Sequence, residues 1–535
     1  MEATASKDNE EQPLHASSSL EASPPEEPDE EPPVVLLAWG APFAQARAFW
    51  IFLLASSVGQ GILFGFVGLA VFLGFTGLQN VSWNQGAYRT ALEDFDAAAI
   101  RQSLALGNGE WWYVGTLTTG GVAVGLIKAL WTFWIRPFPA HPANFLTDVQ
   151  NLSSDEPWEA LPIAACAIVS IGCGASCGPE MPLDALVSAI GGVALPALLN
   201  KVQPSNHVLT MHQSKLCGMD ALAAAFGPLL PSQYLGPLLI YELGQPLWTL
   251  RKYDFHFMEI ITRMAVASTI SYAVFVGIKE RTILHSIPPP EAAYDAIDDS
   301  LIYFLHAIIL GLICGVMGTF AFTLQAVFGV IGGKIQAGID RIGLGQIHEE
   351  IVSGPKRTYL GMILTPTIGG CLVGLLTVAC PLILGDGSAQ LAVILNGAND
   401  LGATTLILSA LAKLLALSIS LGFGFIGGNV FPYLFAGACI GSAAHVLVPE
   451  IPILVSFAVG MAASSSSCFP LIFTFTSFVS MAMALGGFAT SPVFIGAVVS
   501  YFVGPGLGFS QWLVNKGRNG KTEGSKKAED ERATR

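Results

Sequence analysis

Long apolar segments, separated by shorter polar ones, follow one another from about residue 48 to residue 507. A helix needs about 20 residues to cross the hydrocarbon core of a bilayer squarely, and several of these segments are shorter. Many are also interrupted by Gly or Pro, which is typical of membrane helices that end near the middle of the bilayer and line a polar site. The pattern predicts an all-α polytopic membrane protein of tilted and broken helices. The segments expected to be helical are 48–77, 112–135, 160–173, 183–200, 217–240, 258–278, 300–332, 359–384, 403–424, 432–448, 451–463, 468–486 and 490–507.

The composition supports the same class of protein. Of the 535 residues, 52 % are hydrophobic and only 12 % are charged, whereas a soluble globular chain has about 25 % charged residues. The 58 glycines fall mostly in apolar segments, where small residues let membrane helices approach closely. These values exclude a soluble enzyme, a nucleic-acid-binding protein and a disordered scaffold.

The acidic residues are concentrated at the N-terminus. Residues 1–33 contain ten acidic side chains and one lysine, and so supply −9 of the net charge of −14. A Pro- and Ser-rich segment of this kind cannot bury a core. We therefore expect a disordered acidic tail over 1–45, a membrane domain over 46–515 and a polar, charged tail over 516–535.

The basic residues predict the orientation in the membrane. They cluster in the loop 336–358 and in the segment 516–527, and basic loops favour the cytoplasmic side of a membrane. Both regions, and with them both termini, are expected to be cytoplasmic. No basic segment followed by a short apolar one opens the chain, so no cleaved secretory signal is expected.

One motif occurs twice, 250 residues apart. Residues 178–182 read Gly-Pro-Glu-Met-Pro and residues 428–432 read Gly-Asn-Val-Phe-Pro, each before a helix rich in small residues. Proline suits the first turn of a helix, and the preceding glycine lets the backbone approach a ligand. Two helix N-termini aimed at one point would form an anion site from free N–H groups and helix dipoles. A repeat of this kind also fits a transporter built from two inverted halves.

Three ionisable residues lie in apolar segments, where a charge is costly and indicates function by default. Glu180, at the mouth of a predicted helix, is the main candidate; the alternative is a carboxylate that caps that helix at the membrane surface. Glu242 is either a structural carboxylate or part of a transport pathway for protons. Lys413 either raises the local positive potential for anions or snorkels to the membrane surface.

Neither a metal centre nor an enzyme active site emerges from the remaining polar residues. The nine cysteines are odd in number and have no histidines or cysteine pairs at ligand spacing. His306 and His445 are expected to be packed, while Asp184 and Asp220 are expected to cap helices or face water. A membrane enzyme would use Ser464–Ser467 with Lys413, but no companion motif supports one. We expect no enzyme activity, no metal and no cofactor.

These motifs resemble the CLC family of chloride channels and proton-coupled anion transporters. The similarity spans about residues 45–515, in the family's own order. It implies an all-α fold of about 16–18 helices in two inverted-topology halves, a homodimer with one pore per subunit, and a gating role for Glu180. The stretches that carry it are 178–191, 222–226 with 239–242, 384–387 with 422–432, and 459–463 with 470–471.

The chain departs from the family pattern at several site positions. Pro139 stands where the family has an anion-binding serine, Phe509 where it has a tyrosine, and Leu243 where the exchangers have a proton-transfer glutamate. The stretch 138–142 keeps only its final proline. The resemblance implies that the anion-binding positions are Pro139, Ala140, His141, Gly178, Pro179, Met181, Gly428, Asn429, Val430, Phe431 and Phe509.

The resemblance and its departures together predict a passive chloride or anion channel gated by Glu180. The missing hydroxyls predict a weak central site that releases anions quickly. The alternative is a proton-coupled exchanger of chloride or nitrate that uses another proton path; an unrelated carrier is a further alternative. The expected partners are small inorganic anions, the lipid bilayer and a second copy of the chain, with no nucleic acid.

Overall fold

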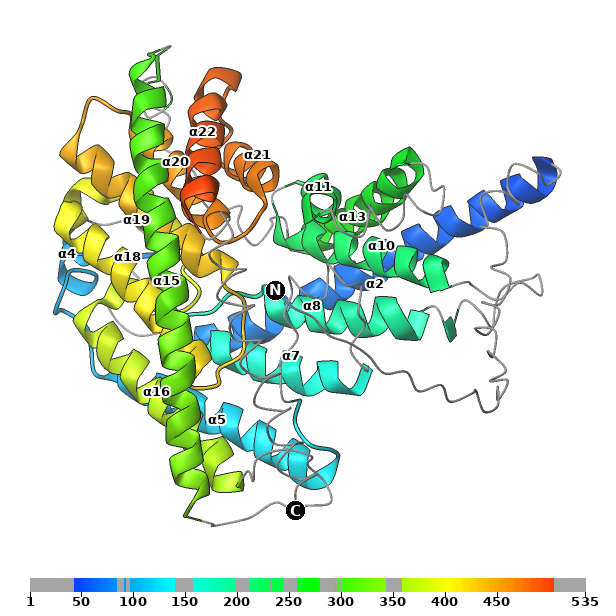
Figure 1. Ribbon diagram of the computed structural model, residues 1–535, viewed down its shortest axis with the longest axis horizontal. Coiled ribbons are helices and arrows are strands. Elements are labelled where there is room, and N and C mark those ends of the chain that lie inside the picture. The colour runs from blue at the N-terminus through cyan, green and yellow to red at the C-terminus, as the bar shows by residue number, and fades with distance from the viewer. Residues whose placement is uncertain are drawn as a thin grey trace, which may run out of the picture. The chain divides into compact units, whose positions relative to one another are not determined.

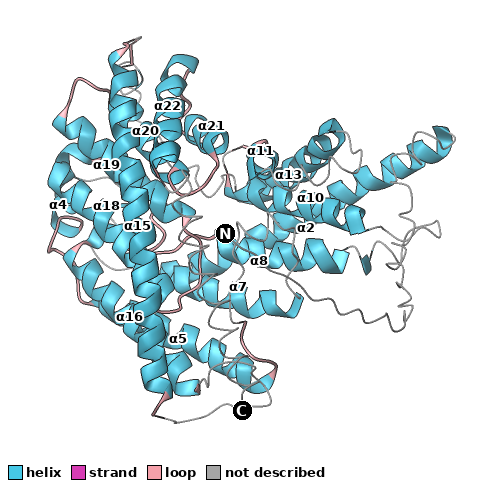
Figure 2. Cartoon of the chain, in the orientation of Figure 1, coloured by secondary structure: helices cyan, strands magenta, loops and turns pink. Residues whose placement is uncertain are grey.

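The computed structural model is almost entirely helical over the residues that it describes (Figure 2). No β-strand occurs among these residues, which confirms the all-α prediction. The structure describes residues 43–83, 91–92, 97–139, 157–195, 197–198, 211–230, 232–243, 257–279, 294, 297–298, 300–342 and 358–504. Within these ranges, only the backbone is described at 43–50, 52–53, 157, 211–216, 243 and 257–259.

Sixteen α-helices, one π-helical turn and one 3₁₀ turn make up the described part of the chain, in the range expected from the resemblance. In chain order they are α2 (Phe43–Ser82), α4 (Ala97–Ser103), α5 (Trp112–Trp134), α7 (Pro157–Gly172), α8 (Glu180–Ala189), η1 (Ile190–Ala194), α10 (Met211–Leu229), α11 (Leu235–Leu243), α13 (Phe257–Lys279), α15 (Ile302–Asp340), α16 (Tyr359–Ala379), η2 (Pro381–Ile383), α17 (Leu391–Asn396), α18 (Ala398–Gly422), α19 (Val430–Leu447), α20 (Ile453–Ser466), α21 (Ile472–Ala482) and α22 (Gly487–Val503).

Seven described helices are long and apolar enough to cross a membrane. Five more apolar helices have only 10–17 residues, so they cannot span about 30 Å of hydrocarbon in a straight line. The predicted mixture of spanning and short helices is confirmed. The spanning helices are Leu54–Ser82, Trp112–Trp134, Ile260–Lys279, Ile302–Asp340, Tyr359–Ala379, Ala398–Gly422 and Val430–Leu447.

The described residues from Trp50 onward form one compact unit, in which α5 lies along α16 and α15 lies along α22 (Figure 1). The helix α15 has 39 residues and is about 58 Å long at 1.5 Å per residue. It therefore extends well beyond the hydrocarbon thickness unless it is strongly tilted.

The predicted segment 217–240 is two helices and not one. The helix α10 ends at Leu229 and α11 begins at Leu235. Pro228 and Pro231 explain the break, because proline has no N–H for the helical hydrogen-bond ladder. The break brings the end of α10 to the central site described below.

Glycines allow the backbones of α19 and α20 to touch. A Cβ added at Gly437 would lie 2.7 Å from the carbonyl carbon of Gly460, and one added at Gly460 would lie 2.9 Å from the nitrogen of Gly441. Such distances are below normal van der Waals contact, so no side chain fits at these positions. Close approach through small residues is the usual way in which membrane helices associate.

We expect Gly460→Ala to destabilise the protein by about 1–3 kcal/mol, because the new methyl group overpacks the contact between α19 and α20. The measurement is the melting temperature of the detergent-solubilised protein. Gly333→Ala in α15 is the matched control, since a Cβ there meets nothing within 4 Å; it should be neutral or stabilising by up to about 1 kcal/mol. Equal melting temperatures for the two variants would contradict the packing argument.

Candidate anion site at two helix N-termini

The two copies of the repeated motif meet at the centre of the protein. Gly178 N donates to Gly428 O over 2.7 Å, and Gly428 N donates to Gly178 O over 2.8 Å. This reciprocal pairing is an isolated antiparallel bridge between segments 250 residues apart. It places the N-terminal ends of α8 and α19 beside each other, as the repeat suggested.

Both glycines are needed because the side chain of Glu180 fills the space next to them. An added Cβ would lie 2.7 Å from Glu180 Cδ at position 178 and 2.5 Å from it at position 428. A side chain at either position would have to displace the carboxyl group. The glycines therefore serve both the backbone pairing and the seat of Glu180.

The carboxylate of Glu180 occupies the N-terminal end of α19. Its Oε1 accepts a hydrogen bond from Phe431 N over 3.1 Å, and the N–H groups of Val430 and of Glu180 itself also act on it. The first N–H groups of a helix have no partner within the helix, and the helix dipole favours a negative charge there. Glu180 is 2 % exposed, and its Oε2 is buried without a hydrogen-bond partner among the described residues. Glu180 is therefore a buried carboxyl group at the N-terminus of α19, and not an exposed carboxylate.

A small apolar cavity of about 20 Å³ adjoins Glu180. By volume it has room for one water molecule. The surface that its lining residues expose to the cavity is apolar, although Glu180 and Thr474 are among them. The lining residues are Glu180, Phe226, Leu229, Leu230, Leu239, Val430, Phe431, Leu434, Leu471, Thr474, Phe475 and Phe478.

Lys413 is completely buried, which excludes snorkelling. Its Nζ donates to Ile383 O over 2.9 Å and to Gly385 O, and lies 4.9 Å from the ring centroid of Phe435. Gly385 N in turn donates to Gly174 O, in the loop that leads to Glu180. Lys413 thus anchors the loop 383–385, which in turn pairs with the loop that leads to Glu180.

A second buried carboxylate accompanies Lys413. Asp386 is 1 % exposed, accepts hydrogen bonds from Ser388, and interacts electrostatically with Lys413 and with Glu180. The sequence analysis did not single out Asp386. The available signal in the sequence was its position in a Gly-Asp-Gly motif between apolar segments. In the structure both flanking glycines adopt positive φ, as in a tight turn.

Glu242 caps a helix. Its Oε1 accepts from Phe473 N over 2.7 Å and its Oε2 accepts from Thr474 N over 2.8 Å. These N–H groups belong to the first turn of α21, so the carboxylate of α11 stabilises the N-terminus of α21. The backbone hydrogen bonds agree with the structural interpretation of Glu242.

Several other predicted site residues are described only in part. Asn429 is the N-cap residue of α19, Pro179 is the N-cap residue of α8, and Pro139 is half-buried. Met181 is buried in the first turn of α8. Ala140, His141 and Phe509, like the side chain of Leu243, lie outside the described residues. The assigned roles of all these residues stay predictions.

Of the two alternatives expected for Asp184 and Asp220, exposure to water was wrong, since both side chains are buried. Asp184 is 1 % exposed and accepts from Ser188 at 3.5 Å, while Asp220 pairs with Arg263. The sequence analysis missed Arg263, which lies 43 residues away on another helix.

The histidines have protein partners. His306 Nε2 is 2.8 Å from Ser456 Oγ, and His445 Nδ1 is 2.7 Å from Ile451 O. Among the residues that the structure describes, no three His, Cys, Asp or Glu side chains are grouped to hold a metal ion.

Comparison with known proteins identifies the family. The family described as "Voltage gated chloride channel" matches residues 124–505. The chain belongs to this family. A curated relative, "Putative ion-transport protein YfeO" of Salmonella choleraesuis (strain SC-B67), is 24 % identical over 353 residues, which are 65 % of this chain and 72 % of the relative.

Solved structures of an antiporter and of a CLC transporter share the fold. A slow cyanobacterial Cl⁻/H⁺ antiporter has a TM-score of 0.60 at 19 % identity, over 85 % of this chain and 95 % of that one. A eukaryotic CLC transporter has a TM-score of 0.54 at 16 % identity, over 86 % and 72 % of the two chains. The predicted CLC-like fold is confirmed, and this member is an integral multi-pass membrane protein of a family that transports anions.

We expect Glu242→Gln to weaken this family member's fold by about 0.5–2 kcal/mol, the usual effect of losing a helix cap. The amide keeps one acceptor oxygen, so one of the two N–H groups of α21 loses its partner. Melting temperature in detergent measures the effect, and Glu242→Ala should lower it further. The control is Glu450→Gln, which changes an exposed carboxylate and should leave the melting temperature unchanged.

Proposed function

We propose that this protein is a passive channel for chloride and other small anions, and that the Glu180 carboxylate is its gate. The observation that carries the proposal is the contact between Glu180 Oε1 and Phe431 N at the N-terminus of α19. A permeating anion would be attracted to the same N–H groups and the same helix dipole. The carboxylate and the anion therefore compete for one place, and removal of the carboxylate opens the path.

The proposed central site is weak, and a weak site favours permeation over tight binding. Pro139 and Phe509 stand where the family has a serine and a tyrosine. A hydrogen bond to a charged group contributes about 1.5–3 kcal/mol, so an anion held by backbone groups alone is released quickly. Fast release is a condition for conduction.

A proton-coupled exchanger is the second candidate, and the cavity beside Glu180 favours it. Glu180 and Thr474 line the same cavity, and the backbone N–H of Thr474 binds Glu242. A proton path between the two carboxyl groups would run along the Thr474 side of this cavity, whose open lining is apolar. Such a route would replace the glutamate that is Leu243 in this chain.

We also propose a homodimer with one pore per subunit. Large apolar side chains are exposed on α11 and α21 and just before α11, including Tyr234 (61 %), Tyr241 (45 %), Phe473 (58 %) and Met481 (49 %). A second copy could cover these side chains, and the resemblance to the family implies the same assembly. Light scattering of the purified protein in detergent tests this assignment.

The proposed orientation has both termini in the cytoplasm, as the basic loop 336–358 indicates. The proposed domain limits are 1–45 for the acidic tail, 46–515 for the pore domain and 516–535 for the C-terminal tail. Accessibility of tags at the two ends in sealed membrane vesicles tests the orientation.

Glu180→Gln should raise the anion flux at neutral pH and remove most of its pH dependence. The amide resembles the protonated side chain at nearly constant volume, so it is no longer attracted to the N-terminus of α19. In the wild-type protein, a lower pH on the side that Glu180 faces should increase the flux for the same reason. The measurement is chloride efflux from proteoliposomes over a series of pH values. A well-folded Glu180→Gln protein with wild-type pH dependence would show that Glu180 is only a structural cap.

The channel proposal further predicts anion flux without stoichiometric proton flux. Proton uptake and chloride efflux are measured together in proteoliposomes under a chloride gradient. Steady proton movement at a fixed ratio to chloride would overturn the channel assignment and establish the exchanger. In that case Glu242→Gln should reduce proton movement by at least about tenfold, since it removes the proposed second proton carrier.

A further inference from the structure

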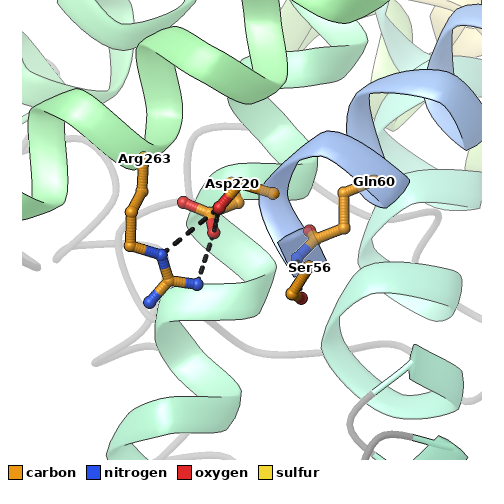
Figure 3. A network of polar contacts seen from close by, with 5 residues as sticks. Ser56, Gln60, Asp220 and Arg263 are labelled. Carbon is orange, nitrogen blue, oxygen red and sulfur yellow. Dashed lines mark hydrogen bonds and ion pairs between the residues drawn. The ribbon is translucent and has the colours of Figure 1, made fainter. Parts of the chain in front are cut away.

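A buried ion pair joins α10 to α13 within the apolar part of the protein (Figure 3). Arg263 Nη2 donates to Asp220 Oδ2 over 2.5 Å, and the two side chains are 5 % and 2 % exposed. From α2, Ser57 Oγ donates to the same carboxylate oxygen over 3.0 Å and accepts from Arg263 Nε over 3.4 Å. Gln60 and Ser56, joined by a hydrogen bond of 3.3 Å, lie beside the pair. Three helices are thus connected at one point.

The ion pair lies at one end of a seam of glycines. On α2, Gly61 and Gly65 follow Ser57 at intervals of four residues and so share its face. Added Cβ atoms would lie 2.7 Å from Ile270 Cβ and 2.8 Å from Val274 Cβ, both on α13. Because α2 has no side chains along this seam, few side-chain contacts oppose sliding of α2 along α13. The hydrogen-bonded pair supplies the specific contact that sets the register.

Stability alone gives no reason for charges at this point. Two buried ions lose their hydration, and well-packed apolar side chains of similar size hold helices together equally well or better. The best-attested role of a buried polar contact is to select one register among several. Asp220 and Arg263 fit that role because they connect α10 to two neighbouring helices at once.

The register of α10 matters because its far end forms the wall of the central cavity. Phe226 and Leu229 belong to α10, Leu230 follows it, and all three line the cavity beside Glu180. Phe226 is six residues beyond Asp220, or about 9 Å along the helix axis. A change in the register of α10 moves this wall against the carboxyl group.

We propose that Asp220 and Arg263 are positioning residues for anion transport, because their ion pair sets where Phe226, Leu229 and Leu230 lie against Glu180. The inference rests on the proposed role of Glu180 as the gate. In this proposal Asp220 and Arg263 act on the gate through the cavity wall that the end of α10 forms.

Several other titratable groups interact with Glu180 or with the residues around it. Asp386 acts on Glu180 directly, Cys177 lies in the adjoining loop, and Lys413 interacts with both of them. Glu242 binds the backbone of Thr474 on the cavity wall. Beside the ion pair itself, Cys217 is the further titratable side chain that interacts with it. These groups stay unchanged in the variants below.

The test removes both charges together, so that neither is left buried and unpaired. The double variant Asp220→Asn/Arg263→Gln keeps polar side chains at both positions; Asn has the size of Asp, and Gln is shorter than Arg. We expect it to fold, to shift the pH midpoint of chloride efflux by at least about half a pH unit, and to change efflux at neutral pH at least threefold. Ser57→Ala should shift the midpoint in the same direction by a smaller amount, and it decides the question if the double variant does not fold.

Two further measurements separate positioning from a general structural effect. In a Glu180→Gln background, the double change should alter efflux less than twofold, because the wall acts through the carboxyl group. The matched control is Arg101→Gln/Asp400→Asn, which neutralises an ion pair of 2.6 Å with Arg101 67 % exposed; it should leave efflux and its pH midpoint unchanged.

Each result decides between the two proposals. An unshifted midpoint in the folded double variant, or an equal change of efflux in the Glu180→Gln background, overturns the positioning role. If Glu180→Gln alone keeps the wild-type pH dependence, the gating proposal fails. If Glu180→Gln removes the pH dependence but the ion-pair variants match the wild type, only the positioning inference fails.

Discussion

A carboxylate bound to the N-terminus of a helix is the interaction on which the centre of this protein depends. Glu180 reaches Phe431 N only because Gly178 and Gly428 pair through their backbones and leave the space for its side chain. The same N–H groups and dipole that hold the carboxylate attract any other anion. The backbone geometry of the site therefore favours negative charge, whether the carboxylate or a permeating ion supplies it.

Backbone carbonyl and N–H groups in irregular segments at the centre of a membrane protein need hydrogen-bond partners from outside those segments. Lys413 supplies two of them, for Ile383 O and Gly385 O, and Gln390 supplies a third for Leu384 O. Gly385 N closes the set by binding Gly174 O. Buried polar side chains thus make it possible for helices to stop within the membrane, so that their ends face one another.

The sequence predicted much of the fold and the core of the candidate site. Hydropathy and length identified the membrane helices because a bilayer imposes both on any spanning segment. The repeated Gly-x-x-x-Pro motif placed Glu180 beside Gly428 because helix starts have local sequence signals. The break between α10 and α11 was missed, although Pro228 and Pro231 were visible, because the flanking segments are uniformly apolar.

What the sequence determined by itself is what local chemistry decides: the helices, their small residues, and the placing of Glu180 at a helix start. The tertiary structure alone decided which buried charges meet. Asp220 finds Arg263 on α13 and Ser57 on α2, and Glu242 finds the first turn of α21, more than 200 residues away. A buried charge needs a partner, but any suitable charged or hydrogen-bonding group nearby can offset the free-energy cost of its burial. Which group is nearby depends on how the helices pack, and that is not written in the spacing of residues along the chain.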